Sequence, residues 1–566
     1  MKKIFNIALS ALMLLPFSGC SNFLSVYPLN DIVEENFWTS MDDVESVLMA
    51  AYAKLESSDC INRMAFWGEM RSDNLVEGSG SVPEDIKRVL TKDNLLQSNT
   101  YVTWSCFYDV INLANTVIAY APVVCEKDPN YRVEQMQSHI AEAKAIRALS
   151  YFYLIRTFKD VPYVTEPTKD DTKDPKIPAT SFEEILHSEI ASLQETVQVE
   201  GKEWANRKFA TDEAQAGRIT RAGVYALLAD MCLWDQDYVN CIEYASRVTK
   251  LKNQQYSEIK EKLRSACDIE LYNGYPLIRA AREAGTDNVG NSYNKIFGDG
   301  FSYESIFELA FIRDQSVKNS FITDYYGASD RPTSLGYLAA NNSMHEDGNS
   351  TTATFAGWQD TRYHESMYYI ASSSKYRINK YVNLGVSYSL KANNPVLEFT
   401  RRVDAVSPNW IIYRYTDVLL LQAEAEACFA KQENLGKNSQ EFSDVISIVN
   451  AVRKRAVVKN VDTISTSTVE TAEDLIEAVM LERRRELAFE GKRWYDLVRR
   501  CRRDGSTEYV INKVMSKYTE NRDAIRIKLH DMDALYFPIS KDELKINPNL
   551  TQNPVYKENE DISKSK

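Results

Sequence analysis

Two glutamates could carry acid–base chemistry. Glu482 and Glu486 stand four residues apart, which places both carboxylates on one face of a helix. A glycosidase instead needs its two carboxylates on opposite sides of the bond that it cleaves, several ångströms apart. The intervening residues are Arg483, Arg484 and Arg485, which offer the glutamates close cationic partners. The sequence therefore favours structural ion pairs here and predicts no catalytic residue.

Histidines beside acidic residues raise the question of a metal site. His345 precedes Glu346 and Asp347, and His364 precedes Glu365. Zinc would need further ligands at a defined spacing, but the nine cysteines form no C-x-x-C pair and the five histidines are scattered. The chain has no EF-hand spacing, phosphate loop, dinucleotide fingerprint or G-x-S-x-G motif. We therefore predict no metal and no cofactor.

Aromatic residues in turn-forming surroundings are the third candidate set. Exposed Trp and Tyr rings can stack on the apolar faces of sugars, while Asp and Asn can bond the hydroxyls. Our ligand-binding candidates are Trp67, Asp73, Asn74, Tyr101, Tyr325, Tyr326 and Trp358. Each ring could instead anchor its own loop by packing, so both interpretations stay open. The prediction is a binding site built from the loops at 60–103 and 271–395.

The charge balance limits the class of ligand. The formal net charge is −13 and the sequence contains no basic block. Nucleic-acid binding needs clustered Lys and Arg, so we expect no nucleic-acid partner. Most cysteines, including Cys106, Cys232, Cys428 and Cys501, fall on apolar helical faces, which favours buried thiols. An exported chain could still oxidise some of them.

The N-terminus predicts export. Residues 1–19 combine Lys2 and Lys3 with an apolar run and small residues before Cys20, which indicates a signal peptide. The residues before Cys20 resemble a lipobox, which would make Cys20 the lipidated mature N-terminus. The alternative is an ordinary secretory signal with an incidental cysteine. No later stretch has about 18 consecutive apolar residues, so we expect no further membrane span.

The candidates must be positioned by helices. Residues 475–500 begin with an amphipathic helix that has Arg483 in its apolar seam, and Glu486 and Glu490 could reach this arginine. Gly491 can adopt a left-handed conformation, so we expect the helix to stop there and a second helix to follow. Residues 220–248, and 411–429 with 442–456, have the spacing of tetratricopeptide-like helix pairs.

The region 271–395 differs in character. It is rich in Gly, Tyr, Asn, Ser and Asp, which predicts loops with short strands. We therefore expect a mainly α protein with a helical region at 20–270, a variable loop-rich ligand-binding region at 271–395 and a second helical region at 396–566.

Several stretches together resemble one family. They are ERRRELAFEGKRWYDLVRR (482–500), GEMRSDN (68–74), CSNFLSVYPLND (20–31) and ALYFPISKDELKINPNLTQNPVY (534–556). These stretches resemble the SusD/RagB family of outer-membrane nutrient-binding lipoproteins of Bacteroidetes. The resemblance implies a SusD-like fold, in which tetratricopeptide-like helix pairs carry a loop-rich ligand-binding region with short strands.

The resemblance also implies a function. Such a protein would be anchored to the outer membrane through lipid on Cys20, facing outwards. It would bind an oligosaccharide without catalysis and deliver it to a SusC-like TonB-dependent transporter. The RagB branch implies peptide as an alternative ligand. A glycoside hydrolase and an interaction scaffold without a small ligand are further alternatives.

Overall fold

The computed structural model describes most of the chain. Residues 1–19 and Cys20 lie outside the described part, as does Trp358. The described residues are 37–168, 176–197, 217–281, 283–311, 319–328, 335–345, 354–355, 359–391, 395–402, 408–457 and 463–557.

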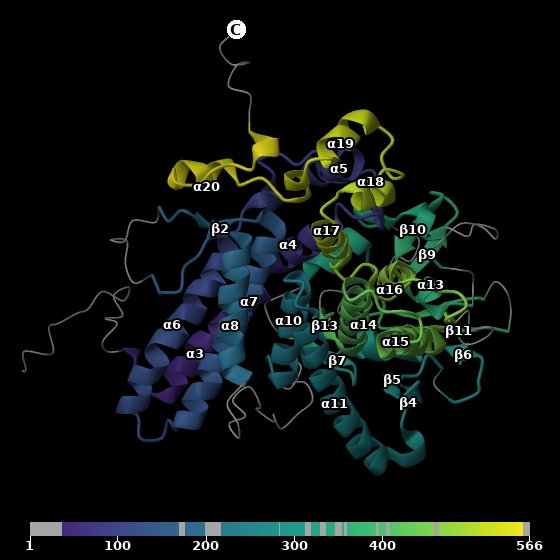
Figure 1. Ribbon diagram of the computed structural model, residues 1–566, viewed down its shortest axis with the longest axis horizontal. Coiled ribbons are helices and arrows are strands. Elements are labelled where there is room, and N and C mark those ends of the chain that lie inside the picture. The colour runs from purple at the N-terminus through teal and green to yellow at the C-terminus, as the bar shows by residue number, and fades with distance from the viewer. Residues whose placement is uncertain are drawn as a thin grey trace, which may run out of the picture.

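The first half of the chain forms a bundle of long helices at the left of Figure 1. They are α3 (Met41–Leu55), α6 (Ser105–Lys127), α7 (Val133–Phe158) and α8 (Phe182–Val197). α6 packs between α3 and α7. Ala141, Ala145 and Ala148 of α7 are fully buried, as their spacing predicts, and such small side chains allow close helix packing.

One stretch in this bundle is apolar enough to cross a membrane. It covers α6 and the turn before it, residues Thr100–Lys127, and is selected by length and composition only. Val110, Ile111, Ala114 and Val117 of α6 are fully or almost fully buried in the protein core. The packing of these side chains accounts for its apolar character without a membrane.

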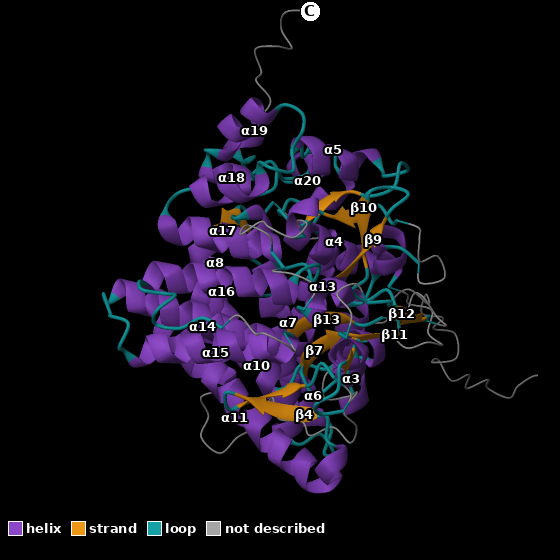
Figure 2. Cartoon of the chain, turned by 90° about the vertical axis from the view of Figure 1, so that its right-hand side faces the viewer, coloured by secondary structure: helices purple, strands orange, loops and turns teal. Residues whose placement is uncertain are grey.

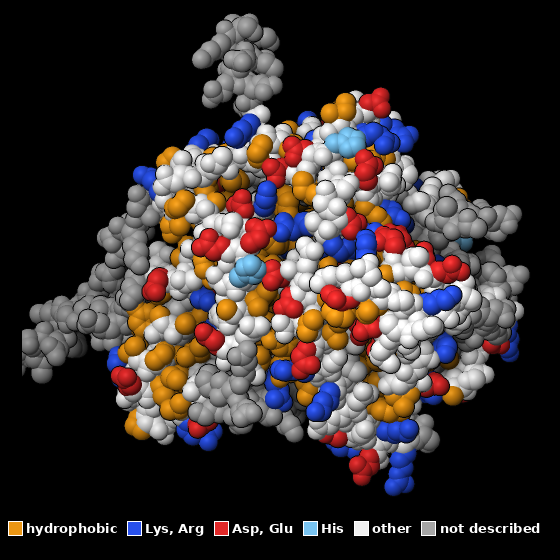
Figure 3. All heavy atoms as spheres, viewed as in Figure 1, with side chains coloured by type: hydrophobic (Ala, Val, Ile, Leu, Met, Phe, Trp, Pro, Cys, Tyr) orange, Lys and Arg blue, Asp and Glu red, His pale blue; other side chains and the backbone are white. Residues whose placement is uncertain are grey.

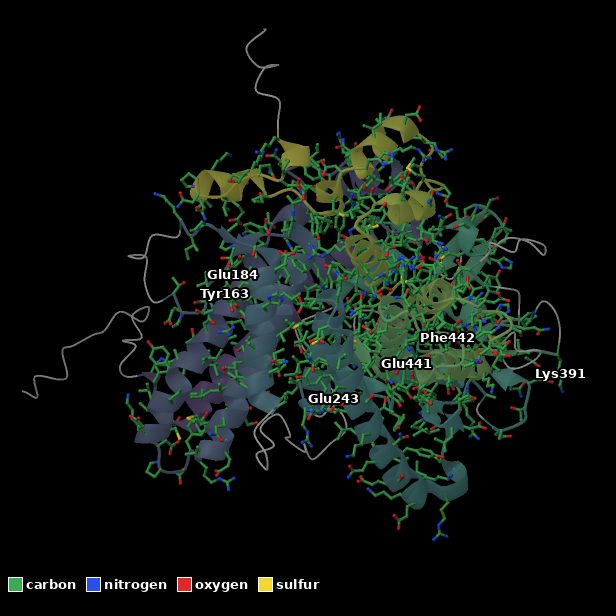
Figure 4. The ribbon with its side chains drawn as sticks, in the orientation of Figure 1. Tyr163, Glu184, Glu243, Lys391, Glu441 and Phe442 are labelled. Carbon is green, nitrogen blue, oxygen red and sulfur yellow. The ribbon has the colours of Figure 1, made fainter. Side chains whose placement is uncertain are left out.

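The rest of the helical frame consists of helix pairs. They are α10 (Arg221–Trp234) with α11 (Tyr238–Leu263), α14 (Tyr415–Gln432) with α15 (Gln440–Ala456), and α16 (Ala472–Leu487) with α17 (Arg493–Asp504). α11 packs on α14, and α14 packs on α16, so the pairs stack into one array. Phe442, labelled with Glu441 in Figure 4, is fully buried near the start of α15. These pairs confirm the predicted mainly α fold with tetratricopeptide-like units.

Short strands make up several small antiparallel sheets, drawn in orange in Figure 2. One sheet has the order β1-β8-β10-β9 and another has the order β12-β11-β6, while three further sheets have two strands each. The strands are β1 (Leu75–Glu77), β2 (Val161–Pro162), β3 (Ala179–Thr180), β4 (Ile269–Tyr272), β5 (Tyr275–Ile278), β6 (Asn288–Val289), β7 (Ser305–Leu309), β8 (Leu338–Ala340), β9 (Met367–Ile370), β10 (Lys375–Ile378), β11 (Gly385–Ser389), β12 (Glu398–Thr400) and β13 (Trp410–Arg414). Most of them fall in or beside 271–395, where the sequence predicts short strands.

The C-terminal residues cover one end of the molecule. Their helices are α18 (Glu508–Val514), α19 (Arg522–Leu529) and α20 (Lys541–Ile546), and α5 (Glu84–Lys92) lies with them at the top of Figure 1. Lys528 of α19 forms an ion pair with Asp93, directly after α5 (2.7 Å). Two short helices, α12 (Asn291–Tyr293) and α13 (Thr361–Ser366), complete the loop-rich region. Helix α4 (Ser58–Glu69) connects the bundle with the centre of the molecule.

Candidate functional site

The acid–base candidates are held in buried ion pairs. Glu482 accepts hydrogen bonds from Arg362 (2.8 Å) and Arg453 (2.9 Å). Glu486 is bonded by Arg414 (2.7 Å), Arg362 (3.1 Å) and Arg455. Although burial opposes ionisation, these arginines lower the pKa of Glu482 to about 2 and that of Glu486 well below its usual range. Neither carboxyl group holds a proton to donate at neutral pH, so the prediction of structural ion pairs is confirmed. Of the three adjacent arginines, however, only Arg485 pairs with Glu482 (3.4 Å), and the other partners come from distant elements.

The partners predicted for Arg483 are wrong. Arg483 binds Asp496 through two hydrogen bonds (3.0 and 2.9 Å) and Asp417 through a third (3.0 Å). Glu490 instead binds Arg414 and Lys380 (both 2.8 Å). Arg483 faces α14 and α17, whereas the carboxylates of Glu486 and Glu490 face arginines and a lysine brought by other elements. Helical spacing alone does not reveal these long-range partners.

Asp73 and Asn74 are buried beneath the surface. The Asp73 carboxylate accepts two hydrogen bonds from Arg493 (2.9 and 3.1 Å) and pairs with Arg484 (3.3 Å). The two guanidinium groups hold the pKa of this carboxyl well below its usual range, in spite of its burial. The Asn74 side chain donates to Glu69 (2.8 Å) and accepts from Arg484 (2.8 Å). In this structure both residues fasten the 68–74 segment to α16 and α17.

Trp67 lies in a helix and not in a predicted loop. It belongs to α4 and its exposed fraction is 0%. The ring stacks on Phe107 with 5.0 Å between centroids, and its edge meets Phe158. Its Nε1 donates to the backbone oxygen of Tyr101 (2.7 Å). These contacts let Trp67 support the Tyr101 backbone from the protein interior. Neither face of the indole ring is exposed to solvent.

Tyr101 and Tyr325 meet in space although they stand 224 positions apart in the sequence. Tyr101 lies in the 3-10 turn Thr100–Val102, and Tyr325 lies in the π-helical turn Ile322–Tyr326. Their hydroxyl groups share a hydrogen bond. The Tyr101 ring stacks almost parallel on Phe66, with 4.3 Å between centroids and 13° between planes. Tyr101 itself is half-buried and presents part of its side chain to solvent.

A third tyrosine, which the sequence analysis did not single out, completes the group. Tyr337 meets Tyr325 edge to face at 5.4 Å and is half-buried. The preceding Gly336 allows the close approach, because a Cβ there would lie 2.3 Å from the Tyr325 backbone oxygen. The Gly-Tyr pair at 336–337 is the sequence signal that could have identified it. We refer to Tyr101, Tyr325 and Tyr337 as the tyrosine surface, in which Tyr101 and Tyr337 are half-buried and Tyr325 is buried between them and the core.

The other predicted binding residues lie apart from this surface or outside the described chain. Tyr326 is fully buried, and its hydroxyl donates to the backbone oxygen of Phe489 (2.8 Å). Tyr326 therefore faces the turn after α16. The ligand-binding role of Trp358 stays a prediction, because this residue lies outside the described part.

Carboxylates border the tyrosine surface. Asp85 accepts hydrogen bonds from the backbone nitrogen and the hydroxyl of Thr100 (both 3.0 Å), so it fixes the turn that carries Tyr101. Asp324 precedes Tyr325, and partial burial raises the pKa of its carboxyl. Half-exposed rings next to hydroxyl and carboxylate groups are suited to a ligand with both apolar faces and hydroxyls.

The described residues support neither a metal site nor a nucleic-acid-binding surface. Over these ranges no three His, Cys, Asp or Glu side chains gather in a way that could hold a metal ion. On the face shown in Figure 3, acidic, basic and apolar side chains are interspersed among the described residues, without a broad basic patch. Phosphate backbones bind to clustered positive charge, so this face does not have the character of a nucleic-acid surface.

Sequence comparisons match almost the whole chain to one group of proteins. A family model described as "SusD family" matches residues 234–556, and one described as "Starch-binding associating with outer membrane" matches residues 22–233. SusD-like protein P38 of Formosa agariphila is 24% identical over 512 residues, which cover 88% of this chain and 92% of that protein. SusD-like protein P2 of the same organism is 24% identical and covers 86% and 89% of the two chains.

Solved structures share the fold. A SusD superfamily protein from Bacteroides thetaiotaomicron has a TM-score of 0.60 at 22% identity, covering 92% of this chain and 99% of that chain. A laminarin binding SusD-like protein has a TM-score of 0.60 at 18% identity, covering 91% and 99%. Surface glycan-binding protein A from Bacteroides uniformis has a TM-score of 0.59 at 19% identity, covering 91% and 100%. Because the SusD family model matches more than half of the sequence, the chain belongs to the SusD family.

Proposed function

We propose that this protein is a non-catalytic lipoprotein that binds an oligosaccharide on the tyrosine surface. The observation that carries the proposal is the placement of Tyr101. Its ring is backed by Phe66, its backbone oxygen is held by Trp67 and its hydroxyl is tied to Tyr325. A half-exposed ring fixed on three sides loses little conformational freedom when a sugar stacks on it.

In the proposal, the other predicted binding residues support the Tyr101 ring from the protein interior. Asp73, Asn74 and Tyr326 hold the 68–74 segment and the π-helical turn against α16 and α17, and Trp67 supports Tyr101 directly. Tyr337 provides a second partly open ring, and Asp85 and Asp324 supply acceptors for hydroxyl groups at the border. This arrangement places the ligand contacts on short turns carried by a rigid helical frame.

The family relationship supports a glycan as the ligand class. Two solved neighbours of the same fold are described as laminarin binding and as surface glycan-binding. The proposal takes an oligosaccharide from this likeness, and a peptide ligand would be the contrary outcome of the binding test. Glycan hydrolysis is not part of the proposal, since the paired glutamates of α16 are fixed in ion pairs.

The proposal includes location and partner. Lipid on Cys20 would hold the protein at the outer membrane, and the family description names outer-membrane association. A SusC-like TonB-dependent transporter would receive the bound oligosaccharide. In this scheme the 271–395 region contributes Tyr337 to the ligand-binding face, with the buried Tyr325 supporting it, while 20–270 contributes Tyr101.

The test is a binding screen with the full protein. Soluble glycans and peptide pools are titrated by calorimetry, and the best ligand is then measured with Tyr101→Ala and with Tyr369→Ala. Tyr369 is the matched control, because it is a 46% exposed tyrosine on β9. We expect glycan binding that Tyr101→Ala weakens and Tyr369→Ala leaves unchanged. Binding of peptides alone, or release of shorter sugars during incubation, would reject the proposal.

A further inference from the structure

A two-residue turn joins β4 to β5. Tyr272 pairs with Tyr275, so Asn273 and Gly274 alone form the turn. Their φ angles are +49° and +91°. Positive φ at both central residues is the mark of a type I′ turn, for which Asn-Gly is a preferred pair. Both residues are exposed, and no other Asn-Gly pair occurs in the sequence.

The Asn273 side chain is bonded to α15, which packs against this hairpin (Figure 1). Its Nδ2 donates to the Ser447 backbone oxygen (2.9 Å), and its Oδ1 accepts from Nζ of Lys454 (2.8 Å). A backbone oxygen only accepts and an ammonium group only donates, so both partners require the same orientation of the amide. The amide is therefore held at its oxygen and at its nitrogen, while the turn itself stays exposed to water.

The backbone nitrogen of Gly274 is accessible beside this amide. A Cβ on Gly274 would meet nothing within 4 Å, so this residue is not packed against the rest of the protein. Within the described ranges, its nitrogen donates to no other backbone oxygen. Glycine also has no side chain that could hinder an approach of this nitrogen to the preceding residue. Water can reach the N–H group, and the nitrogen is free to react.

We propose that Asn273 is a site of spontaneous deamidation and that Lys454 promotes the reaction. The attacking atom is the backbone nitrogen of Gly274, and the attacked atom is Cγ of Asn273. The Lys454 ammonium group acts on Oδ1, the atom that becomes negatively charged during the attack. The co-reactant is water. The proposal does not depend on the tyrosine surface or on the proposed glycan ligand.

The reaction has two steps. Hydroxide removes the N–H proton of Gly274, and the nitrogen forms a bond to Cγ of Asn273 while charge develops on Oδ1, where the Lys454 hydrogen bond stabilises it. The Cγ–Nδ2 bond then breaks, and Nδ2 takes a proton from water and leaves as ammonia, which gives a five-membered cyclic imide. In the second step water opens this ring at either carbonyl, to aspartate or to isoaspartate. One asparagine and one water thus give one acid and one ammonia.

The two products change the hairpin differently. Aspartate at position 273 keeps the path of the main chain and places a carboxylate next to Lys454, but the Ser447 backbone oxygen loses its donor. Isoaspartate adds one methylene group to the main chain, so the turn no longer has the two-residue geometry that joins Tyr272 to Tyr275. Deamidation would therefore be a slow and irreversible change in the contact between this hairpin and α15.

Mass spectrometry of the aged full-length protein tests the proposal. The folded protein is incubated at mildly alkaline pH, and samples are digested with trypsin, which releases peptide 265–279 with Asn273 as its only asparagine. We expect this peptide to convert steadily to its two acid forms, and an isoaspartyl methyltransferase identifies the isoaspartate. Asn438 is the internal control, because it is exposed but is followed by Ser439, whose side chain hinders the attack. No conversion at Asn273, or equal conversion at Asn438, would overturn the proposal.

Variants test the role of Lys454. Lys454→Met keeps an unbranched side chain but removes the ammonium group, so conversion at Asn273 should become several-fold slower. The matched control is Lys437→Met, which removes another exposed lysine, before the first turn of α15, and should leave the rate unchanged. Both side chains are exposed, and the melting temperature of each variant verifies its fold. An unchanged or faster conversion in Lys454→Met would show that the lysine does not promote the reaction and would overturn the proposal.

Discussion

Gly68 of α4 and Gly491, in the turn between α16 and α17, touch through their backbones. A Cβ on Gly68 would lie 1.8 Å from the Gly491 backbone oxygen, closer than any real Cβ contact. Gly491 has a φ of +70°, and a Cβ there would lie 3.0 Å from the Trp410 ring. Next to Gly68, the Glu69 carboxylate accepts backbone hydrogen bonds from Lys492 (3.2 Å) and Arg493 (3.4 Å). This contact fixes α4, and thereby Trp67 and Tyr101, on the α16–α17 turn.

Gly68→Ala should destabilise the protein. The methyl group has no space, so α4 must move away from the turn, which costs about 1–3 kcal/mol of the free energy of unfolding or more. Chemical denaturation measures this loss. The control is Gly80→Ala, where a Cβ meets nothing within 4 Å. Equal stability of the two variants would show that the glycine contact is not required.

The ring of Tyr101 and its hydroxyl should contribute differently to ligand binding. Tyr101→Ala should weaken oligosaccharide binding by about ten-fold, or 1–2 kcal/mol, because a stacking face is lost. Tyr101→Phe keeps that face and removes only the hydrogen bond to Tyr325, so it should bind more tightly than Tyr101→Ala. Calorimetry measures both affinities. Tyr326→Phe, which loses a buried bond to Phe489, should lower stability and affect affinity less than Tyr101→Ala. Normal binding by Tyr101→Ala would place the ligand elsewhere.

Removing the buried charge of Glu486 should be costly. Glu486→Gln leaves Arg362, Arg414 and Arg455 without their shared carboxylate, and breaking a buried pair costs about 3–5 kcal/mol. The free energy of unfolding in urea measures the effect. In the matched control, Glu195→Gln removes the charge of a side chain that is 71% exposed and paired with Lys144. The free energy of unfolding should change by about 1 kcal/mol or less. A small effect of Glu486→Gln would refute a central role for this network.

Glu365 should make stability depend on pH. Burial raises its pKa from 4.5 to about 7. The folded state therefore binds more protons than the unfolded state between these values. The resulting stability is present below pH 4.5 and is lost as pH rises through 7. In urea titrations, Glu365→Gln should remove its own share of this decline, which is on the order of 1–3 kcal/mol. Burial also raises the pKa values of Glu56, Glu69 and Glu426, so the remaining part of the decline should persist.

Glu482→Gln is the control for this pH profile, because the pKa of Glu482 is lowered to about 2. Its carboxylate contributes stability that is lost only as pH falls through 4.5 towards 2, so the decline between pH 4.5 and 7 should persist in that variant. An unchanged decline in Glu365→Gln would assign the effect to another group.

Cys20→Ala should release the protein from the membrane. The thioether lipid is the proposed anchor, so removal of the cysteine that accepts it removes the attachment to the membrane. Membrane fractionation with immunoblotting measures the distribution, and Cys125→Ser serves as a cysteine control. Retention of Cys20→Ala in the outer-membrane fraction would reject lipidation at this residue. Protease treatment of intact cells determines whether the protein faces outwards.

The amino-acid sequence by itself determined the helical frame. Apolar residues at helical spacing predict the α10–α11 pair and the α14–α15 pair, because this period fixes which face of a helix must be buried. The position of Gly491 predicts the turn between α16 and α17, since its φ of +70° is a conformation that glycine adopts readily. The predicted end of α16 at Gly491 is wrong, because the helix already ends at Leu487. These are local properties, and neighbouring residues are enough to define them.

Only the tertiary structure decided which residues far apart in the sequence contact each other. Arg483 binds Asp417 and Asp496, and Tyr101 meets Tyr325, through contacts that helical spacing does not encode. Trp67 has turn-forming neighbours in the sequence, yet its ring is buried in the core. The adjacent Gly68 contacts Gly491, and this contact holds the end of α4 in the protein interior. Burial depends on which surfaces meet when the helices stack, and that depends on side chains hundreds of positions apart.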